Sequence, residues 1–106
     1  NLGMTFDVCH AALHCHHSNI SLNSYTNEIL PLVSHFHLSD AVGIDGEGVQ
    51  VGEGQINFDS FFNNLEDKGY KDKNFSWVTE IWSGHVNHGS GCRKSMHNLS
   101  LYKGCL

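Results

Sequence analysis

The sequence predicts an α/β fold built around a parallel sheet. Three short apolar, β-prone runs lie near residues 4–8, 35–41 and 75–82, and each is followed by a loop and a helix-like stretch. Strands that alternate with helices in this way favour parallel pairing with right-handed crossovers. The carboxyl-terminal ends of these runs carry side chains that can bind metal, namely Asp7, His10, His37 and Glu80.

The first β/α unit starts with a strand over residues 4–8, and a polar, histidine-rich segment over residues 10–19 is predicted to be a loop. Apolar residues at helical spacing then predict a helix over residues 24–33. Pro31 would strain the middle of this helix, so we expect it to be short or kinked. The second strand is expected over residues 35–41.

The second unit continues with residues 43–54, whose five glycines predict a loop too flexible for a regular element. A helix is predicted over residues 58–70. Asp59 or Ser60 can cap its start and Gly69 can stop it.

The third unit comprises a strand over residues 75–82 and a last helix over residues 93–102. Side chains alternate along a strand, so the parity of each run can be compared with the position of its candidate ligand. In each strand the candidate ligand (Asp7, His37 or Glu80) lies on the face opposite to the apolar side chains that are expected to pack against the helices. We therefore expect the three ligands to face one side of the sheet and the helices to cover the other.

The composition limits the function classes. A chain of 106 residues forms one domain at most, and its formal charge of -5 with six Lys and Arg argues against a stand-alone polyanion binder. No run is long enough to span a membrane and no secretory signal is visible.

Four cysteines could form two disulfides. Cys9, however, lies in a strand-end motif and Cys15 in the histidine-rich segment, so we expect reduced thiols and a cytoplasmic protein. The remaining cysteines are Cys92 and Cys105.

Two carboxylates and two imidazoles form a mixed oxygen and nitrogen donor set, which suits Mn²⁺, Zn²⁺, Co²⁺ or Mg²⁺ better than Ca²⁺. A second possibility is a zinc knuckle in the run His14-Cys15-His16-His17, but these neighbours are too crowded for one tetrahedral site. His35 shares the face of His37 and is expected to pack rather than to bind.

Four short motifs occur in order along nearly the whole chain: Asp7-Val8-Cys9-His10-Ala11, His37-Leu38-Ser39-Asp40, Gly52-Glu53-Gly54-Gln55-Ile56 and Glu80-Ile81-Trp82. Together they resemble the xylose isomerase-like TIM-barrel superfamily, which includes sugar and sugar-phosphate isomerases and epimerases and the endonuclease IV type of abasic-site nuclease. The resemblance implies a partial (β/α)8 barrel. Residues 1–106 would be its C-terminal portion, with about three of the eight strands.

The resemblance also implies roles for individual residues. Asp7 and His37 correspond to family metal ligands, and Glu80 to the last-strand ligand that doubles as an acid/base in the epimerases. His10 corresponds to a histidine that binds a second metal in the nucleases and lies beside the substrate in the sugar enzymes. The family also uses a glutamate from an earlier strand, which this chain does not reach, so its metal site is expected to be incomplete.

Further substrate contacts are expected from two loops. Glu53 lies in a Gly-Glu-Gly turn whose backbone N–H groups could bind a phosphate, although turn formation alone also explains the glycines. His85 and His88 lie in the loop after the third strand, where either could contact the substrate.

The motifs favour sugar chemistry over DNA repair. Endonucleases carry an Asp-x-His pair shortly before the Gly-Glu-Gly, whereas residues 45–51 contain no histidine. The implied activity is a divalent-metal-dependent isomerase or epimerase that transfers a proton through an enediolate on a sugar or sugar phosphate. The first alternative is a phosphodiester hydrolase acting on abasic DNA.

The second alternative is a non-catalytic half-barrel fragment. A half barrel exposes two sheet edges, so its expected partner is the missing N-terminal half or a second chain.

Overall fold

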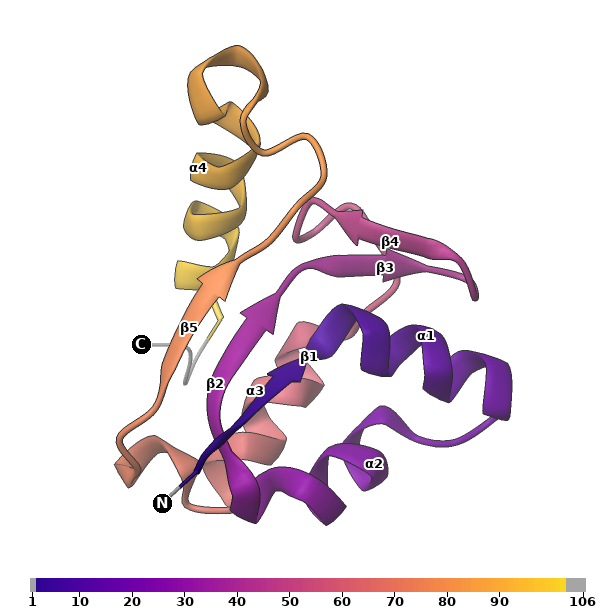
Figure 1. Cartoon of the computed structure of the whole chain (residues 1–106), viewed down its shortest axis with the longest axis vertical. Coiled ribbons are helices and arrows are strands. Elements are labelled where there is room, and N and C mark those ends of the chain that lie inside the picture. The colour runs from indigo at the N-terminus through magenta and orange to yellow at the C-terminus, as the bar shows by residue number, and fades with distance from the viewer. Residues whose placement is uncertain (1, 103–106) are drawn as a thin grey trace.

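The computed structural model describes residues 2–102, and its centre is a three-stranded parallel sheet (Figure 1). The strands are β1 (Met4–Asp7), β2 (Val33–Leu38) and β5 (Ser76–Thr79), arranged in the order β1-β2-β5. Both pairings are parallel, as predicted. β1 and β5 form the two edges of this open sheet, which is consistent with part of an eight-stranded barrel.

The sheet separates an apolar face from a polar one. Phe6, Phe36 and Leu38 are buried, whereas Thr5 is exposed and His37 is only partly covered. Figure 1 shows α3 (Phe58–Asp67) behind the sheet, where its aromatic side chains complete the core. The predicted strand parity is therefore confirmed, and the face without helices carries the candidate ligands.

The expectation of a loop over residues 10–19 is wrong, because the chain forms the helix α1 (Val8–Ser18) there. Asp7 ends the strand and caps this helix, since its side chain accepts a hydrogen bond from the N–H of His10 at 2.9 Å. The polar residues of α1 face solvent, while Leu13 and its neighbours on the inner face are buried.

The next helix is short, as Pro31 predicts. α2 (Leu22–Ile29) begins after a Ser21 cap and passes into a 3-10 turn, η1 (Leu30–Leu32), that contains the proline. The fixed φ of proline is tolerated in the first turn of this element.

The glycine-rich segment 43–54 is more regular than expected. β3 (Asp40–Val42) and β4 (Gly46–Val49) pair antiparallel as a hairpin beyond the end of β2. The second predicted strand is therefore divided at Ser39. Gly43 has φ +62°, a left-handed conformation that glycine adopts without strain and that closes the turn.

α3 is capped by Asn57, not by Asp59 or Ser60 as predicted. The Asn57 side chain accepts a hydrogen bond from the N–H of Ser60 at 3.0 Å, and Gly69, at φ +72°, follows the helix end as expected. Its left-handed conformation leads into the 3-10 turn η2 (Tyr70–Asp72).

The last helix is longer than predicted. α4 (Val86–Ser100) starts seven residues before residue 93, and residues 87–89 have left-handed backbone angles that interrupt its first turn.

The three cysteines within the described residues, Cys9, Cys15 and Cys92, are free thiols, as expected. Burial raises the pKa of the Cys9 and Cys15 thiols. Cys105 lies outside the described residues. Among residues 2–102, none of the helices has both the length and the apolar character needed to cross a bilayer.

A buried carboxylate organises the segment after the hairpin. Asp40 is 1% exposed, and its Oδ2 accepts the N–H groups of Gly52 and Gly54, both at 3.0 Å. Its Oδ1 accepts the N–H groups of Ile56 at 3.0 Å and of Ala41 at 2.9 Å. One side chain thereby satisfies four backbone donors.

We predict that Asp40→Ala strongly destabilises the chain. The substitution leaves the buried N–H of Ala41 and the more accessible N–H groups of Gly52, Gly54 and Ile56 without their acceptor. An unsatisfied buried group costs about 1–3 kcal/mol, and a group that water can reach costs less. The free energy of unfolding should fall by roughly 3 kcal/mol or more, as measured by denaturant unfolding followed by circular dichroism. Asp45→Ala, on the exposed side of the same hairpin, is the control and should change stability by less than about 0.5 kcal/mol. Equal stabilities for the two variants would contradict the role given to Asp40.

Candidate metal centre

Three elements of the sheet deliver the candidate ligands to one place. Asp7 ends β1 and lies directly beside His37 in the β1–β2 register. His37 in turn pairs with Val78 of β5, and Glu80 follows two residues later on the same face. The N–H of Glu80 donates to the carbonyl of Leu38 at 3.3 Å, which continues the pairing past the end of β5.

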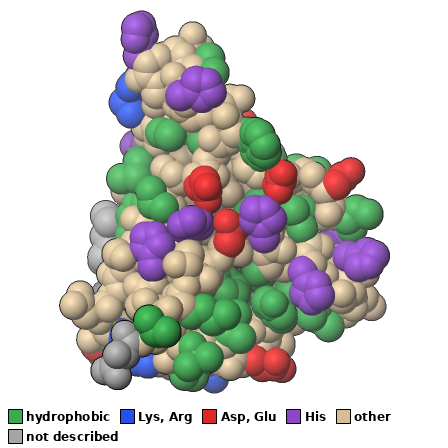
Figure 2. Space-filling view, viewed as in Figure 1, with side chains coloured by type: hydrophobic (Ala, Val, Ile, Leu, Met, Phe, Trp, Pro, Cys, Tyr) green, Lys and Arg blue, Asp and Glu red, His purple; other side chains and the backbone are tan. Residues whose placement is uncertain are grey.

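The side chains of these three residues converge as predicted. His37 Nδ1 lies 2.7 Å from a carboxylate oxygen of Glu80 and 3.7 Å from Asp7 Oδ2. One ligand atom from each residue lies within 4.8 Å of the other two. Figure 2 shows acidic and histidine side chains gathered near the middle of this face.

The donor set fits a divalent ion. Two carboxylates and one imidazole suit Mn²⁺, Mg²⁺, Co²⁺ or Zn²⁺, and three protein ligands leave coordination positions for water or substrate. Asp7 and His37 are partly buried, with side chains 25% and 32% exposed, whereas Glu80 is 63% exposed. The two inner residues can therefore hold an ion while Glu80 reaches toward the open side.

His10 lies between two carboxylates. Its Nδ1 is 3.0 Å from Asp7 Oδ1, and its Nε2 is 2.7 Å from a carboxylate oxygen of Glu47. Hydrogen bonds to Glu47, and to a lesser extent to Asp7, raise the pKa of His10. This arrangement favours the protonated imidazole.

Glu47 is a site residue that the sequence alone did not identify. It lies on β4, and it reaches His10 only because the hairpin folds back toward α1. The glycines around it indicated a flexible loop, so no local pattern pointed to this contact.

Asp7, His10, Glu47 and Glu80 line one cavity of about 320 Å³. Its lining combines the charged groups with an indole: Asp7, His10, Ser39, Glu47, Gly48, Glu80, Ile81 and Trp82. Such a mixture of convergent polar groups and an aromatic side chain is typical of a small-molecule site.

Glu53 and His85 lie elsewhere. The Glu53 side chain is exposed and accepts a hydrogen bond from Gln50 Nε2 at 3.2 Å. His85 is exposed and immediately precedes α4. Neither residue lines the cavity that contains Asp7, so the structure does not bring them to the three candidate ligands.

The idea that the Gly-Glu-Gly turn binds phosphate through its backbone is wrong for this conformation. The N–H groups of Gly52 and Gly54 donate to Asp40, and that of Glu53 donates to the Gln50 carbonyl. Turn formation, the simpler explanation, accounts for the glycines.

The histidine-rich run forms no metal site among the residues that the structure describes. His14, Cys15, His16 and His17 are consecutive in α1, where neighbouring side chains point in different directions. His35 bonds to Ser76 Oγ at 2.7 Å, in keeping with a packing role.

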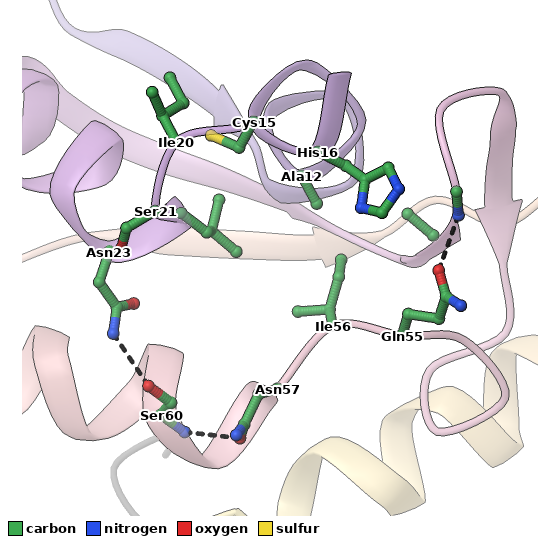
Figure 3. Close-up of a pocket in the computed structure, with 13 residues that line it drawn as sticks. Ala12, Cys15, His16, Ile20, Ser21, Asn23, Gln55, Ile56, Asn57 and Ser60 are labelled. Carbon is green, nitrogen blue, oxygen red and sulfur yellow. Dashed lines mark hydrogen bonds between the residues drawn. The ribbon is translucent and has the colours of Figure 1, made fainter. Parts of the chain in front are cut away.

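A second cavity, of about 300 Å³, lies between α1, α2, β3 and the start of α3 (Figure 3). Several of its polar side chains form hydrogen bonds within the fold. Asn23 donates to Ser60 Oγ at 2.9 Å, Asn57 accepts from the Ser60 N–H, and Gln55 accepts from the Gly43 N–H at 2.8 Å. These bonds join neighbouring elements, so the cavity that contains Asp7 is the better candidate for chemistry.

Comparison with known proteins agrees with this geometry. Residues 1–100 match the xylose isomerase-like TIM barrel family. Neither the curated proteins nor the solved structures include a match to this sequence. With almost its whole length matched, the chain belongs to the xylose isomerase-like TIM-barrel family, and the side chains that could hold a metal lie at the ends of its parallel strands.

Proposed function

We propose that this chain supplies the catalytic end of a divalent-metal-dependent sugar isomerase or epimerase. The observation that carries the proposal is the convergence of Asp7, His37 and Glu80 at the carboxyl ends of parallel strands. In barrels of this kind, that end of the sheet is where active sites are built.

Asp7, His37 and Glu80 would hold the ion. A bound divalent ion supplies a Lewis acid, which polarises a sugar carbonyl and offsets the negative charge that develops on oxygen. Asp7 and His37 orient this centre from inside the sheet, because both are anchored in paired strands.

Glu80 and His10 would move protons. Glu80 is the most exposed of the three candidate ligands, so its carboxylate can reach the carbon next to the carbonyl and exchange a proton there. His10, whose pKa is raised, can give a proton to a sugar oxygen on the other side of Asp7. The two groups supply the base and the acid that a proton-transfer isomerase requires.

The proposed activity belongs to a closed barrel. The β1 and β5 edges each have one strand neighbour, and the family's additional glutamate ligand would come from an earlier strand. We propose that the missing strands come from an N-terminal half of the same protein or from a second chain.

Glu80→Gln should abolish proton exchange while leaving much of the sugar binding intact. The amide retains an oxygen for coordination but cannot accept a proton, and loss of general acid–base catalysis costs about 10²-fold or more in rate. The protein, with the missing strands present so that the barrel is complete, is incubated with divalent metal and candidate sugars in D₂O. Carbon-bound deuterium is followed by NMR. Glu28→Gln, on the exposed side of α2, is the matched control and should exchange normally.

Two other outcomes of this experiment would overturn the proposal. Metal-dependent cleavage of an abasic duplex, with no deuterium entering any sugar, would show the nuclease instead. Metal binding without either reaction would show the non-catalytic fragment. The structure favours the sugar enzyme over the nuclease because the hairpin brings Glu47, not a histidine, to His10.

Glu47→Gln should lower the pKa of His10. The neutral amide removes the largest cause of the raised value, so the imidazole loses its proton at lower pH. The measurement is an NMR titration of the His10 ring in protein freed of metal with a chelator. Glu53→Gln, which removes an acid that does not contact His10, should leave this titration unchanged.

The ion pair between His10 and Glu47 makes the free energy of unfolding depend on pH. Since folding raises the pKa of His10, the stabilisation is complete below the unfolded value and is lost as the pH rises through the folded one. Glu47→Gln should therefore reduce stability at acidic pH and have little effect at alkaline pH. A pH-independent loss would contradict the ion pair.

A further inference from the structure

We propose that Trp82 is an aromatic platform on which the C–H face of an uncharged sugar lies. The inference rests on the proposed function and specifies the substrate class of the same cavity. It starts from an indole that the core does not use.

Trp82 is 70% exposed, although tryptophan is the largest apolar side chain. The other tryptophan of the chain, Trp77, is partly buried and packs against the main core. Packing within the described residues therefore accounts for Trp77 but not for Trp82.

The position of Trp82 points to a ligand. It lines the same cavity as Asp7, His10 and Glu80, and it follows Glu80 by two residues. An exposed indole beside a group of metal-binding side chains can contact whatever those side chains hold.

The backbone holds Trp82 firmly in this position. The backbone N–H of Trp82 donates to the carbonyl of Gly48 at 3.0 Å. A Cβ at Gly48 would lie 1.8 Å from Cδ1 of the indole, so the ring lies directly on the glycine backbone, which has φ +65°. The indole is preorganised by β4, and binding need not order a mobile side chain.

The chemistry of the cavity selects the ligand class. The face of an indole carries negative electrostatic potential, which attracts the weakly positive C–H groups on one side of a sugar ring. Carboxylates and imidazoles beside it can bind the hydroxyl groups. Among the residues that the structure describes, the lining includes Asp7, Glu47 and Glu80 but neither Lys nor Arg, so it disfavours a phosphate near the indole. An uncharged aldose or ketose fits these groups better than a sugar phosphate.

The test labels the protein, with its barrel complete, with 5-fluorotryptophan and follows each indole by ¹⁹F NMR in the presence of Mg²⁺. Xylose, glucose and fructose are the probes, with glucose 6-phosphate for comparison. Trp82→Phe assigns the resonance, and Trp77 provides an internal control. We expect an uncharged sugar to shift the Trp82 signal and leave the Trp77 signal in place.

Variants measure the contribution of the ring. Trp82→Ala should weaken sugar binding about tenfold, in line with aromatic contacts of this kind, and should leave Mg²⁺ binding unchanged. Trp82→Phe should recover part of the affinity, and Gly48→Ala should lower it by displacing the indole. Met96→Ala removes an exposed apolar side chain on α4 and should bind the sugar normally.

Several outcomes overturn the inference: no shift of the Trp82 signal with any sugar, equal affinity in Trp82→Ala, or tighter binding of the phosphate. Failure of the proposed function is seen separately. In that case sugar binding still depends on Trp82, but no deuterium enters the sugar in the exchange experiment.

Discussion

The surroundings of the candidate metal centre depend on the hydrogen bonds that Asp40 accepts. This buried carboxylate fixes residues 52–56, because it accepts the backbone N–H groups of Gly52, Gly54 and Ile56. α4 holds the neighbouring residue from the other side, since the Val51 N–H donates to Ser95 Oγ at 3.1 Å and Asn98 donates to the Val51 carbonyl at 2.7 Å. These polar bonds, together with the burial of Val51 in the main core, thus determine the path of the chain after β4.

The path of the chain explains which element supplies which groups of the cavity. The sheet supplies the candidate ligands, whose positions follow from strand register. The hairpin supplies what surrounds them, because Glu47 binds His10 and Gly48 supports the indole of Trp82. A substitution in the sheet should therefore affect the proposed metal binding first. A substitution in the hairpin should affect the proton on His10 or the proposed contact with a sugar.

The same division separates what the sequence could predict from what it could not. Asp7, His37 and Glu80 were predictable because alternation along a strand and the shared edge of a parallel sheet are local rules. α1 was not, since its polar composition hides a buried face that only tertiary packing reveals. The hairpin was missed for a related reason: it is supported by Asp40, whose backbone N–H donors lie 12–16 residues along the chain and leave no periodic pattern.

Asp7 shows why a strand-end carboxylate is a good ligand here. Its Oδ1 accepts the backbone N–H of His10 at 2.9 Å and lies 3.0 Å from the ring of the same residue. Its Oδ2 faces His37 and remains available to an ion. Capping α1 and binding metal therefore use different oxygens and do not compete. The amino terminus of the helix also stabilises the negative charge, and the cap restricts the rotamer. A side chain held in this way would need little reorganisation to bind an ion, so the first turn of α1 belongs to the candidate metal centre.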